Sequence, residues 1–415
     1  MRQRMGWRVA TGVVALAWLL GLLGAPVADA QGTVKVGFVG PLTGVYAAPG
    51  ADMRDGFLLY WSQIGNKAGG RTVEVIVEDK GSNKPEDALT KARKLVDRDG
   101  VHILAGVIST PVAVQLAKYA TDQKVPLIVA NAGADAITQK ARSPYVFRSS
   151  FANSDSSHPL GEWAYKQGYR KMVLMASDYG AGYEQTGGFA RTFTEAGGKI
   201  IKEVYSPLGT ADFAPFISQI DRSADVVAVF YAGADALRFV KAYEEYGLKA
   251  KIPLIGKGFL TDDSILPQQQ EVAAVGIVTA LHWSRALDNP ENQTFSRAYE
   301  ERYRRPATVY AEQGYVAAQM TAMALETVKG NVENKQGFLA ALGKVEVDAP
   351  RGKVKLDAFH NPIHPIYILK VEKKGGVLQN TPIASYPNTG QFWKWTPEAY
   401  MAMPDYAAMK GKWVK

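Results

Sequence analysis

The fold is decided at residues 33–44, which read TVKVGFVGPLTG. The first seven of these residues are mainly apolar, as in a buried strand. Residues 40–44 then form a turn whose glycines permit close approach of the backbone to a ligand, and Tyr46 follows within reach of anything bound above the sheet. A helical stretch near residues 50–64 comes next. A strand, a tight turn and a helix in this order predict the first βα unit of an α/β fold.

An export signal precedes this strand directly. Three arginines within the first eight residues stand before an apolar run of 15 residues from Val9 to Leu23, which is too short to span a bilayer comfortably. The small residues Ala28-Asp29-Ala30 predict cleavage before Gln31, so residues 1–30 are expected to be a signal peptide. An uncleaved anchor helix is the alternative. We therefore expect the mature protein outside the cytoplasm.

Length and composition narrow the class of protein. Without residues 1–30 the chain holds 385 residues, more than a single core usually supports, so two domains are expected. The chain has no cysteine, which excludes disulfides, thiolate metal sites, a cysteine nucleophile and a lipid-modified N-terminal cysteine. We therefore expect a soluble protein of a Gram-negative periplasm and not a lipoprotein. The net charge of +8 falls to +6 without the three arginines and one aspartate of the signal, and its scattered basic residues do not indicate nucleic-acid binding.

Two series of strands and helices follow one another along the chain. Near-continuous apolar strands separated by amphipathic helices predict parallel sheets covered on both faces, and ligands bind such sheets beyond the carboxyl ends of the strands. No flexible linker separates the two series, which indicates domains joined by several ordered crossings. The expected strands cover residues 33–39, 72–78, 101–105, 125–129 and 145–148 in the first series, and 172–176, 200–206, 226–230, 253–255 and 276–281 in the second.

The last part of the chain has a different character. Helices are expected to dominate residues 292–343, including a long one at 308–329. Residues 351–371 are interpreted as short strands around residues 357–362. The segment at 380–415 is rich in Pro, Trp, Tyr and Met, and we expect residues 386–415 to pack on the surface as a C-terminal tail.

The chain lacks a recognisable set of catalytic or metal-binding residues. His360 and His364 are the two histidines closest in sequence, but they flank Pro362 in an expected turn, where the helical geometry of a metal pair is not formed. No Gly-x-Ser-x-Gly elbow, Walker loop or complete dinucleotide fingerprint occurs. We therefore expect no enzymatic activity, no metal and no cofactor.

The βα turns offer candidates for ligand binding. Ser109 and Thr110 precede a helix after the third strand, where they either cap the helix or hold a ligand. Small residues at 131–135 start another helix after the fourth strand, where free amides and the helix dipole suit a carboxylate. Strand ends of the second series carry aromatic side chains beside glycines, which favours a stacking or lid role, although a single buried aromatic is normally core. These aromatics are Tyr179, Tyr231, Phe259 after Gly258, and Trp283.

Five motifs together resemble the periplasmic substrate-binding proteins of branched-chain amino acid type ABC transporters, the Leu/Ile/Val-binding family. They are Val36–Gly44, Met53-Arg54-Asp55-Gly56, Val125-Pro126-Leu127-Ile128, Asp178-Tyr179-Gly180 and Arg351-Gly352-Lys353-Val354. Each motif is weak alone, but their order and spacing are specific, and the resemblance covers residues 33 to about 375. It implies a type I periplasmic binding fold, that is, an α/β protein with two doubly wound parallel-sheet lobes joined by three hinge crossings. Such lobes close on a ligand and then dock on a membrane permease.

The resemblance also implies lobe boundaries and residue roles. Lobe one is expected at 31–149 plus 280–350, lobe two at 150–279 plus 351–385, and the tail at 386–415. In the family a hydroxyl after the third strand and small residues after the fourth hold the ligand carboxylate. The matching positions are Ser109 or Thr110, with Ala132, Gly133 and Ala134, while Tyr179 and Tyr231 match the lobe-two aromatics. Tyr46, Gly258, Phe259 and Trp283 complete the expected walls.

One departure from the family concerns the ligand. Amino-acid binders of the family carry an acidic residue after the strand expected at 253–255, where it pairs with the ligand ammonium. This chain has Lys257-Gly258-Phe259 instead. A buried ammonium without a counter-charge is costly. We therefore expect an aromatic or aliphatic acid, or a small amide, in preference to an α-amino acid, unless Asp178 or Asp235 replaces the missing acid.

Three functions from different classes follow from these observations. The leading one is a receptor for uptake, with a small-molecule ligand and a membrane permease as partners, no nucleic acid, and a monomeric state. A branched-chain amino acid binding protein is the alternative for the ligand, and a sensor that reports its ligand to a signalling protein is the alternative for the pathway. An extracellular enzyme is disfavoured by the missing catalytic sets.

Overall fold

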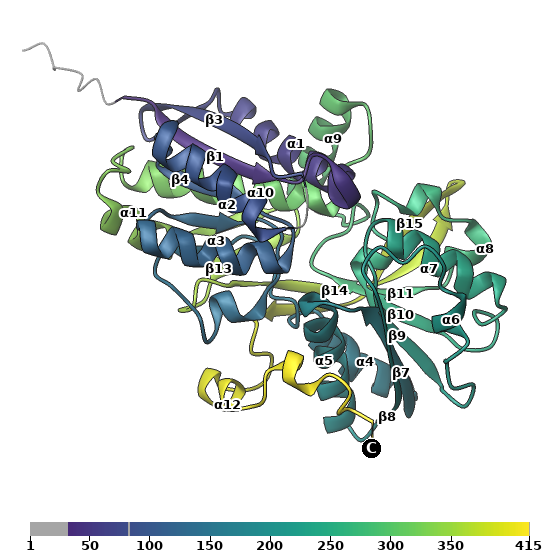
Figure 1. The fold of residues 1–415 in the computed structure, drawn as a ribbon. Coiled ribbons are helices and arrows are strands. Elements are labelled where there is room, and N and C mark those ends of the chain that lie inside the picture. Colours follow the sequence, from purple (N-terminus) through teal and green to yellow (C-terminus); the bar gives the residue numbers. More distant parts are fainter. Residues whose placement is uncertain (1–31, 82–83, 415) are drawn as a thin grey trace, which may run out of the picture. The chain divides into compact units, whose positions relative to one another are not determined.

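Two β-sheets, each covered by helices, form the fold of the computed structural model, which describes residues 32–81 and 84–414 (Figure 1). The predicted signal peptide at 1–30 lies outside the described residues. In the part of the chain that is described, no helix is both long and apolar enough to cross a bilayer.

The first sheet has the strand order β2-β3-β1-β4-β5-β6. All its neighbours pair in parallel except the short antiparallel pair β2 and β3. Strand β1 corresponds to the first expected strand and lies in the middle of the sheet. Six of its seven residues are buried, as expected for a strand covered on both faces. The strands are β1 (Val34–Gly40), β2 (Lys67–Ala68), β3 (Arg71–Asp79), β4 (Ile103–Gly106), β5 (Leu127–Val129) and β6 (Val146–Arg148).

Helices from two separate parts of the chain, residues 47–123 and 290–342, cover this sheet. Helices α1 and α10 pack closely because each presents a glycine: a Cβ on Gly56 would lie 1.8 Å from the Ala311 carbonyl oxygen, and one on Gly314 would lie 2.0 Å from the Met53 carbonyl oxygen. We call the first sheet and its helices lobe one. The helices are α1 (Ala47–Gln63), α2 (Pro85–Arg93), α3 (Thr110–Gln123), α9 (Pro290–Tyr303), α10 (Val309–Thr327) and α11 (Lys335–Leu342), with short turns η1 (Gly44–Tyr46), η2 (Lys94–Arg98) and η3 (Asp135–Thr138).

The second sheet has the order β12-β13-β14-β11-β10-β9-β7-β8, with β15 paired to β14. Strands β7 to β11 run parallel, and β14 pairs antiparallel with β11, so the sheet is mixed. The strands are β7 (Lys171–Ser177), β8 (Lys199–Ser206), β9 (Val226–Phe230), β10 (Leu254–Lys257), β11 (Val278–Leu281), β12 (Glu346–Ala349), β13 (Gly352–Leu356), β14 (Pro362–Lys374) and β15 (Val377–Thr389).

Helices on both sides of β7 to β11 complete lobe two. They are α4 (Ser157–Lys166), α5 (Gly180–Glu195), α6 (Ala214–Ile217), α7 (Ala234–Glu245) and α8 (Glu271–Ala274), with short turns η4 (Gly258–Leu260) and η5 (Leu266–Gln268). The chain passes between the lobes three times: after β6, after β11, and between α11 and β14, where the short strands β12 and β13 lie (Figure 1). The fold is therefore the predicted pair of lobes with three hinge crossings.

Strands lie around residues 357–362 as expected, since β13 ends at Leu356 and β14 begins at Pro362, but β14 is longer than expected. Strands β14 and β15 each hold 13 residues and form one long hairpin. Its turn is Gly375-Gly376, with φ of 57° and 83°, and glycine reaches these values without steric cost. Two glycines between alternating strands are a hairpin signal. The hairpin adds antiparallel strands to the expected parallel sheet of lobe two.

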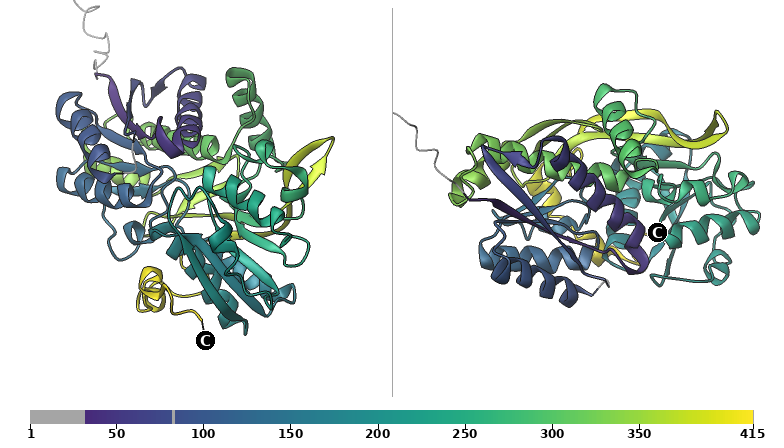
Figure 2. Two further views of the ribbon diagram at one scale, coloured as in Figure 1. Left: turned by 45° about the vertical axis from the view of Figure 1, so that its right-hand side comes forward. Right: turned by 90° about the horizontal axis from the view of Figure 1, so that it is seen from above.

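The C-terminal segment lies beside α5 and is yellow in Figures 1 and 2. It contains α12 (Pro397–Met401) and η6 (Tyr406–Met409). The ring of Tyr406 covers Gly187, where a Cβ would come within 2.3 Å of it, and its hydroxyl lies 2.6 Å from Nε2 of His158. Asp405 forms an ion pair of 2.6 Å with Lys140 of lobe one. This segment therefore contacts both lobes.

Candidate ligand-binding site

A narrow cavity of about 30 Å³ lies between the lobes, at the carboxyl ends of the central strands. Residues following β1, β4, β5 and β6 meet residues following β7, β9 and β10, together with the start of α10. This is where ligands bind in open α/β sheets. The lining residues are Tyr46, Ile108, Thr110, Asn131, Gly133, Phe151, Asn153, Tyr179, Ala181, Gln185, Phe230, Ala232, Phe259 and Tyr310.

The backbone leading to Thr110 is strained. Val107 directly after β4 has a φ of 74°, which a β-branched residue rarely adopts. Three hydrogen bonds hold it there: its N–H donates to the Val39 carbonyl at 2.9 Å, and its carbonyl accepts from the N–H groups of Asn131 and Ala132 at 3.2 and 3.0 Å. Such conformations persist where the surrounding structure holds them, often at binding sites. The strained turn sets the start of α3, and Thr110, at the cavity.

A chain of uncharged polar side chains crosses the cavity from one lobe to the other. The Asn153 Nδ2 donates to Thr110 Oγ1 at 3.2 Å, and its Oδ1 accepts from Gln185 Nε2 at 3.3 Å. Gly133 packs against the same side chain, since a Cβ there would lie 2.2 Å from Asn153 Oδ1. The amino end of α3 adds the positive end of its dipole. This end of the cavity can therefore hold a carboxylate.

Aromatic rings from both lobes form the walls. Phe259 of lobe two stacks on Tyr310 of lobe one, with ring centroids 5.4 Å apart and an interplanar angle of 24°. Phe259 also packs against Phe151 of the first crossing at 5.4 Å, and Tyr179 lies 6.2 Å from Phe230. Stacked and tilted rings of this kind suit a flat aromatic ligand.

Two phenol groups meet across the cleft. The hydroxyls of Tyr46 in lobe one and Tyr179 in lobe two share a hydrogen bond. Burial raises the pKa of both phenols, and burial also raises the pKa of Tyr310 well above its usual value. All three hydroxyls therefore stay protonated at neutral pH and can donate hydrogen bonds.

None of the described residues that line the cavity carries a charge. The two carboxylates that could have replaced the missing acid are already engaged. Asp235 accepts from Arg238 at 2.6 Å and from the Gly209 N–H at 2.8 Å, while Asp178 pairs with Lys410 and accepts from the Tyr183 hydroxyl at 2.6 Å. The site therefore offers no free carboxylate from these two residues to a ligand ammonium.

One half-buried carboxyl, Glu184, contacts a lining residue from outside the cavity. It accepts from Asn153 Nδ2 at 2.5 Å and from the Asp135 N–H at 3.3 Å. Burial raises the pKa of Glu184 well above its usual value, and burial raises that of Asp135 to about 6. Both groups thus resist ionisation beside the cavity.

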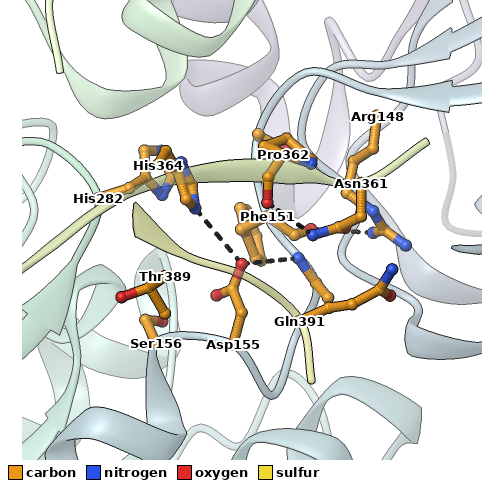
Figure 3. Close-up of polar contacts among 12 residues, drawn as sticks. Arg148, Phe151, Asp155, Ser156, His282, Asn361, Pro362, His364, Thr389 and Gln391 are labelled. Carbon is orange, nitrogen blue, oxygen red and sulfur yellow. Dashed lines mark hydrogen bonds and ion pairs between the residues drawn. The ribbon is translucent and has the colours of Figure 1, made fainter. Parts of the chain in front are cut away.

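Ionisable side chains gather next to Phe151, at the crossings between the lobes. Figure 3 shows Asp155 with its contact to His364, near Phe151 and His282. Asp155 forms ion pairs with Lys257 at 3.7 Å and His364 at 3.5 Å, and Glu312 forms one with Arg351 at 2.5 Å. The rings of His282 and His364 stack at 5.2 Å. We call this set the hinge cluster, and it consists of Asp155, Lys257, His282, Glu312, Arg351 and His364, each with a fully buried side chain.

The pKa values of the hinge cluster follow from burial and pairing. Burial alone would raise the pKa of Asp155, but Lys257 and His364 bring it below its usual value. Burial lowers the pKa of Lys257 to about 8 against the opposing effect of Asp155, and burial lowers the pKa of His282 well below its usual value. At neutral pH the cluster thus holds charged Asp155 beside Lys257, with His282 neutral.

The structure brings five of the predicted site residues together around the cavity: Tyr46, Thr110, Gly133, Tyr179 and Phe259. The others lie beside it or in the core. Ser109 precedes α3, and the carbonyls of Ala132 and Ala134 accept hydrogen bonds from Arg148. Gly258 packs against Leu281, Tyr231 stacks on Phe239 at 4.5 Å, and Trp283 Nε1 donates to Asn292 at 2.7 Å.

Sequence reasoning missed several lining residues. Tyr310 comes from a helix far along the chain, and nothing in its local sequence indicated a site. Phe151 and Asn153 lie on the first crossing, where a strand end at residue 148 was expected, and the same strand-end logic could have found them. The remaining missed residues are Ile108, Asn131, Ala181, Gln185, Phe230 and Ala232.

Comparisons with known proteins agree with this architecture. The family described as periplasmic binding protein matches residues 33–376. The "Leu/Ile/Val-binding protein homolog 6" of Brucella melitensis is 34% identical over 364 residues, 86% of this chain and 92% of that protein.

Two solved structures are solute-binding proteins of ABC transporters. One from R. palustris, in complex with benzoate, is 34% identical with a TM-score of 0.80 and covers 86% of this chain and 98% of its own. One from Rhodopseudomonas palustris BisB5, in complex with 3,4-dihydroxybenzoic acid, is 34% identical with a TM-score of 0.82 and the same coverage. With two lobes around a shared cavity and a family match over most of its length, this chain belongs to the periplasmic binding protein family.

Proposed function

We propose that this protein is the periplasmic receptor of an ABC uptake transporter and binds an aromatic carboxylate of the benzoate class for delivery to a membrane permease. The observation that carries the ligand class is the composition of the cavity. Aromatic rings from both lobes enclose it, its polar groups are neutral, and none of its described lining residues is charged. Related solute-binding proteins hold benzoate and 3,4-dihydroxybenzoic acid.

We place the ligand carboxylate at the polar end of the cavity, which Thr110, Gly133 and Asn153 form. Thr110 and Asn153 supply hydrogen-bonding side chains there, and the absence of a Cβ at Gly133 lets the Asn153 side chain pack against the backbone. The ligand ring then lies among Phe259, Tyr310 and the other aromatic walls. Because both lobes supply walls, binding favours the closed arrangement over an open one, and the closed form is the one that docks on the permease.

An α-amino acid fits this cavity less well. Its ammonium would lose water without gaining a charged partner among the lining residues, and Asp178 and Asp235 are engaged elsewhere. Leaving a buried charge without its partner typically costs about 3–5 kcal/mol. The relatives named for leucine, isoleucine and valine remain the reason to include those amino acids in any test.

The test is a calorimetric binding screen of residues 31–415. We expect benzoate and hydroxybenzoates to bind and leucine not to bind. At about 1,000 times Kd, a ligand should also stabilise the folded state by about 4 kcal/mol. Binding of leucine, with none of the benzoates, would overturn the proposed ligand class.

A matched pair of variants ties the binding to the cavity. Tyr179→Ala removes a wall, whereas Tyr246→Ala removes an exposed tyrosine of lobe two. We expect only the first to weaken benzoate binding. Equal affinities in both variants would place the ligand elsewhere.

A further inference from the structure

We infer that Lys257 determines the charge specificity of the site, favouring an anionic ligand from behind the cavity wall without touching it. This inference rests on the proposed function. It concerns the position where amino-acid binders were expected to carry an acid, and where this chain carries the opposite charge.

The first step is the position of the ammonium. Lys257 is the last residue of β10, two residues before the wall residue Phe259, and its side chain is fully buried. Its Nζ lies 4.4 Å from the ring centroid of Phe151, which lines the cavity. The ring of Phe151 therefore contacts the ammonium and also borders the space where the ligand lies. With the Phe151 ring between them, a charge on the ligand interacts with the Lys257 ammonium through a poorly solvated region.

The second step is the incomplete compensation of this charge. Nζ of Lys257 donates to the Ser156 hydroxyl, but Asp155 Oδ1 lies 3.7 Å away and has no hydrogen-bond partner. Charge-assisted bonds between an ammonium and a carboxylate are usually about 2.7–2.9 Å long. The same carboxylate is shared with His364 at 3.5 Å and accepts from the Ala152 N–H at 3.0 Å. A second negative charge nearby is therefore favourable.

The third step is the consequence for different ligands. A benzoate carboxylate at the polar end gains attraction to Lys257, a neutral amide of the same shape gains little, and an ammonium is repelled. With an effective dielectric constant of about 20 and about two side chains between the ligand carboxylate and the Lys257 ammonium, their attraction should lower Kd roughly tenfold. The lysine thus complements the neutral lining, which alone would accept an acid and its amide alike.

The experiment compares benzoate with benzamide by calorimetry in the wild type and in Lys257→Met, whose unbranched side chain preserves most of the volume. We expect Kd for benzoate to rise about tenfold and Kd for benzamide to change less than twofold. Lys241→Met, a change of the same net charge at an exposed site of lobe two, is the control and should leave both values unchanged.

Each alternative result has a clear meaning. An unchanged benzoate affinity in Lys257→Met, or an equal loss for both ligands, overturns the inference, because a structural role in holding Phe151 would weaken both. If Lys257→Met does not fold, Lys257→Gln, which removes the charge but keeps a polar side chain beside Asp155, must show the same selective loss. A wild type that binds neither ligand refutes the proposed function itself, which separates the two failures.

Discussion

The cavity and the hinge cluster meet at one ring, that of Phe151, and differ in their chemistry. The cavity is lined by aromatic and neutral polar side chains, whereas the hinge cluster holds six ionisable side chains, all fully buried. Phe151 belongs to the cavity wall and contacts Lys257 of the cluster. The separation shows how a protein can keep charges between two lobes without offering them to the ligand as direct partners.

The difference has an energetic reason. A buried ion pair adds little net stability, but a buried charge that loses its partner is strongly destabilising. We therefore expect changes in the hinge cluster to act on folding, and changes in the cavity to act on binding. The predictions below test that division, from the largest expected effect to the smallest.

Removing Glu312 should give the largest effect. Glu312→Ala leaves Arg351 fully buried without its carboxylate partner, and we expect a loss of about 3–5 kcal/mol in the free energy of unfolding. Urea denaturation measures it. Glu346→Ala, which breaks an exposed pair with Lys353, is the control and should change stability by less than about 1 kcal/mol. Similar losses in both variants would contradict the division.

Adding a methyl group at Gly133, at the polar end of the cavity, should weaken binding strongly, with a smaller effect on folding. In Gly133→Ala the new methyl group would lie 2.2 Å from Asn153 Oδ1 and 2.6 Å from Phe151 Cε2, so both lining side chains must move. We expect benzoate affinity to fall about 100-fold, or roughly 2.7 kcal/mol. Gly390→Ala is the control, since its methyl group would meet only Ile363 at 3.7 Å. Retained affinity in Gly133→Ala would remove this end from the site.

A buried histidine outside the cavity should make the fold sensitive to acid. Burial, assisted by Arg191, lowers the pKa of His158 to about 3, while in the unfolded chain it is about 6.5. Below pH 6.5 the unfolded chain binds a proton that the folded chain does not, so this residue makes stability fall as pH drops toward 3. The slope is at most about 1.4 kcal/mol per pH unit.

The measurement is the free energy of unfolding at pH 7 and pH 5 in the wild type and in His158→Gln. We expect the variant to lose less stability on acidification, by about 2 kcal/mol. Buried His282, whose pKa is also lowered by burial, keeps part of the wild-type slope in the variant. An identical slope in both proteins would refute the assignment to His158.

The smallest effect should come from the hydroxyl pair across the cleft. Tyr179→Phe keeps the ring but removes its hydrogen bond to Tyr46 in the closed form, and we expect benzoate affinity to fall by about 1 kcal/mol, or roughly fivefold. Stability without ligand should stay within about 1 kcal/mol. Tyr246→Phe on the exposed surface is the control. An unchanged affinity would show that this hydrogen bond does not contribute to closure around the ligand.

The parts of the site that could be predicted are those that follow strand ends. The sequence could predict Thr110, Gly133 and Tyr179, because apolar strands are recognisable in it and ligands bind beyond the carboxyl ends of such strands. Trp283 and Tyr231 follow the same rule but lie in the core, because the direction of a side chain at a strand end changes with a single residue. The local pattern therefore finds the right turns without selecting the right side chains.

Some features depended on contacts between distant segments. Tyr310 reaches the cavity because glycines in α1 and α10 allow those helices to pack closely. The partners of Glu312 and Asp155 come from residues that lie late in the chain, at 351 and 364. No local pattern indicates pairs at such separations.

By itself the sequence determined the class of protein: alternating apolar strands and helices dictate an α/β fold, the absence of cysteine excludes thiol chemistry, and the motif order indicates the family. Only the tertiary structure decided how charge is distributed around the site. It directed Lys257 toward Asp155 and Phe151, and it engaged Asp178 and Asp235 in other ion pairs. The physical reason is that hydrophobic periodicity is a local property, whereas the cost of burying a charge depends on every neighbour that folding brings to it.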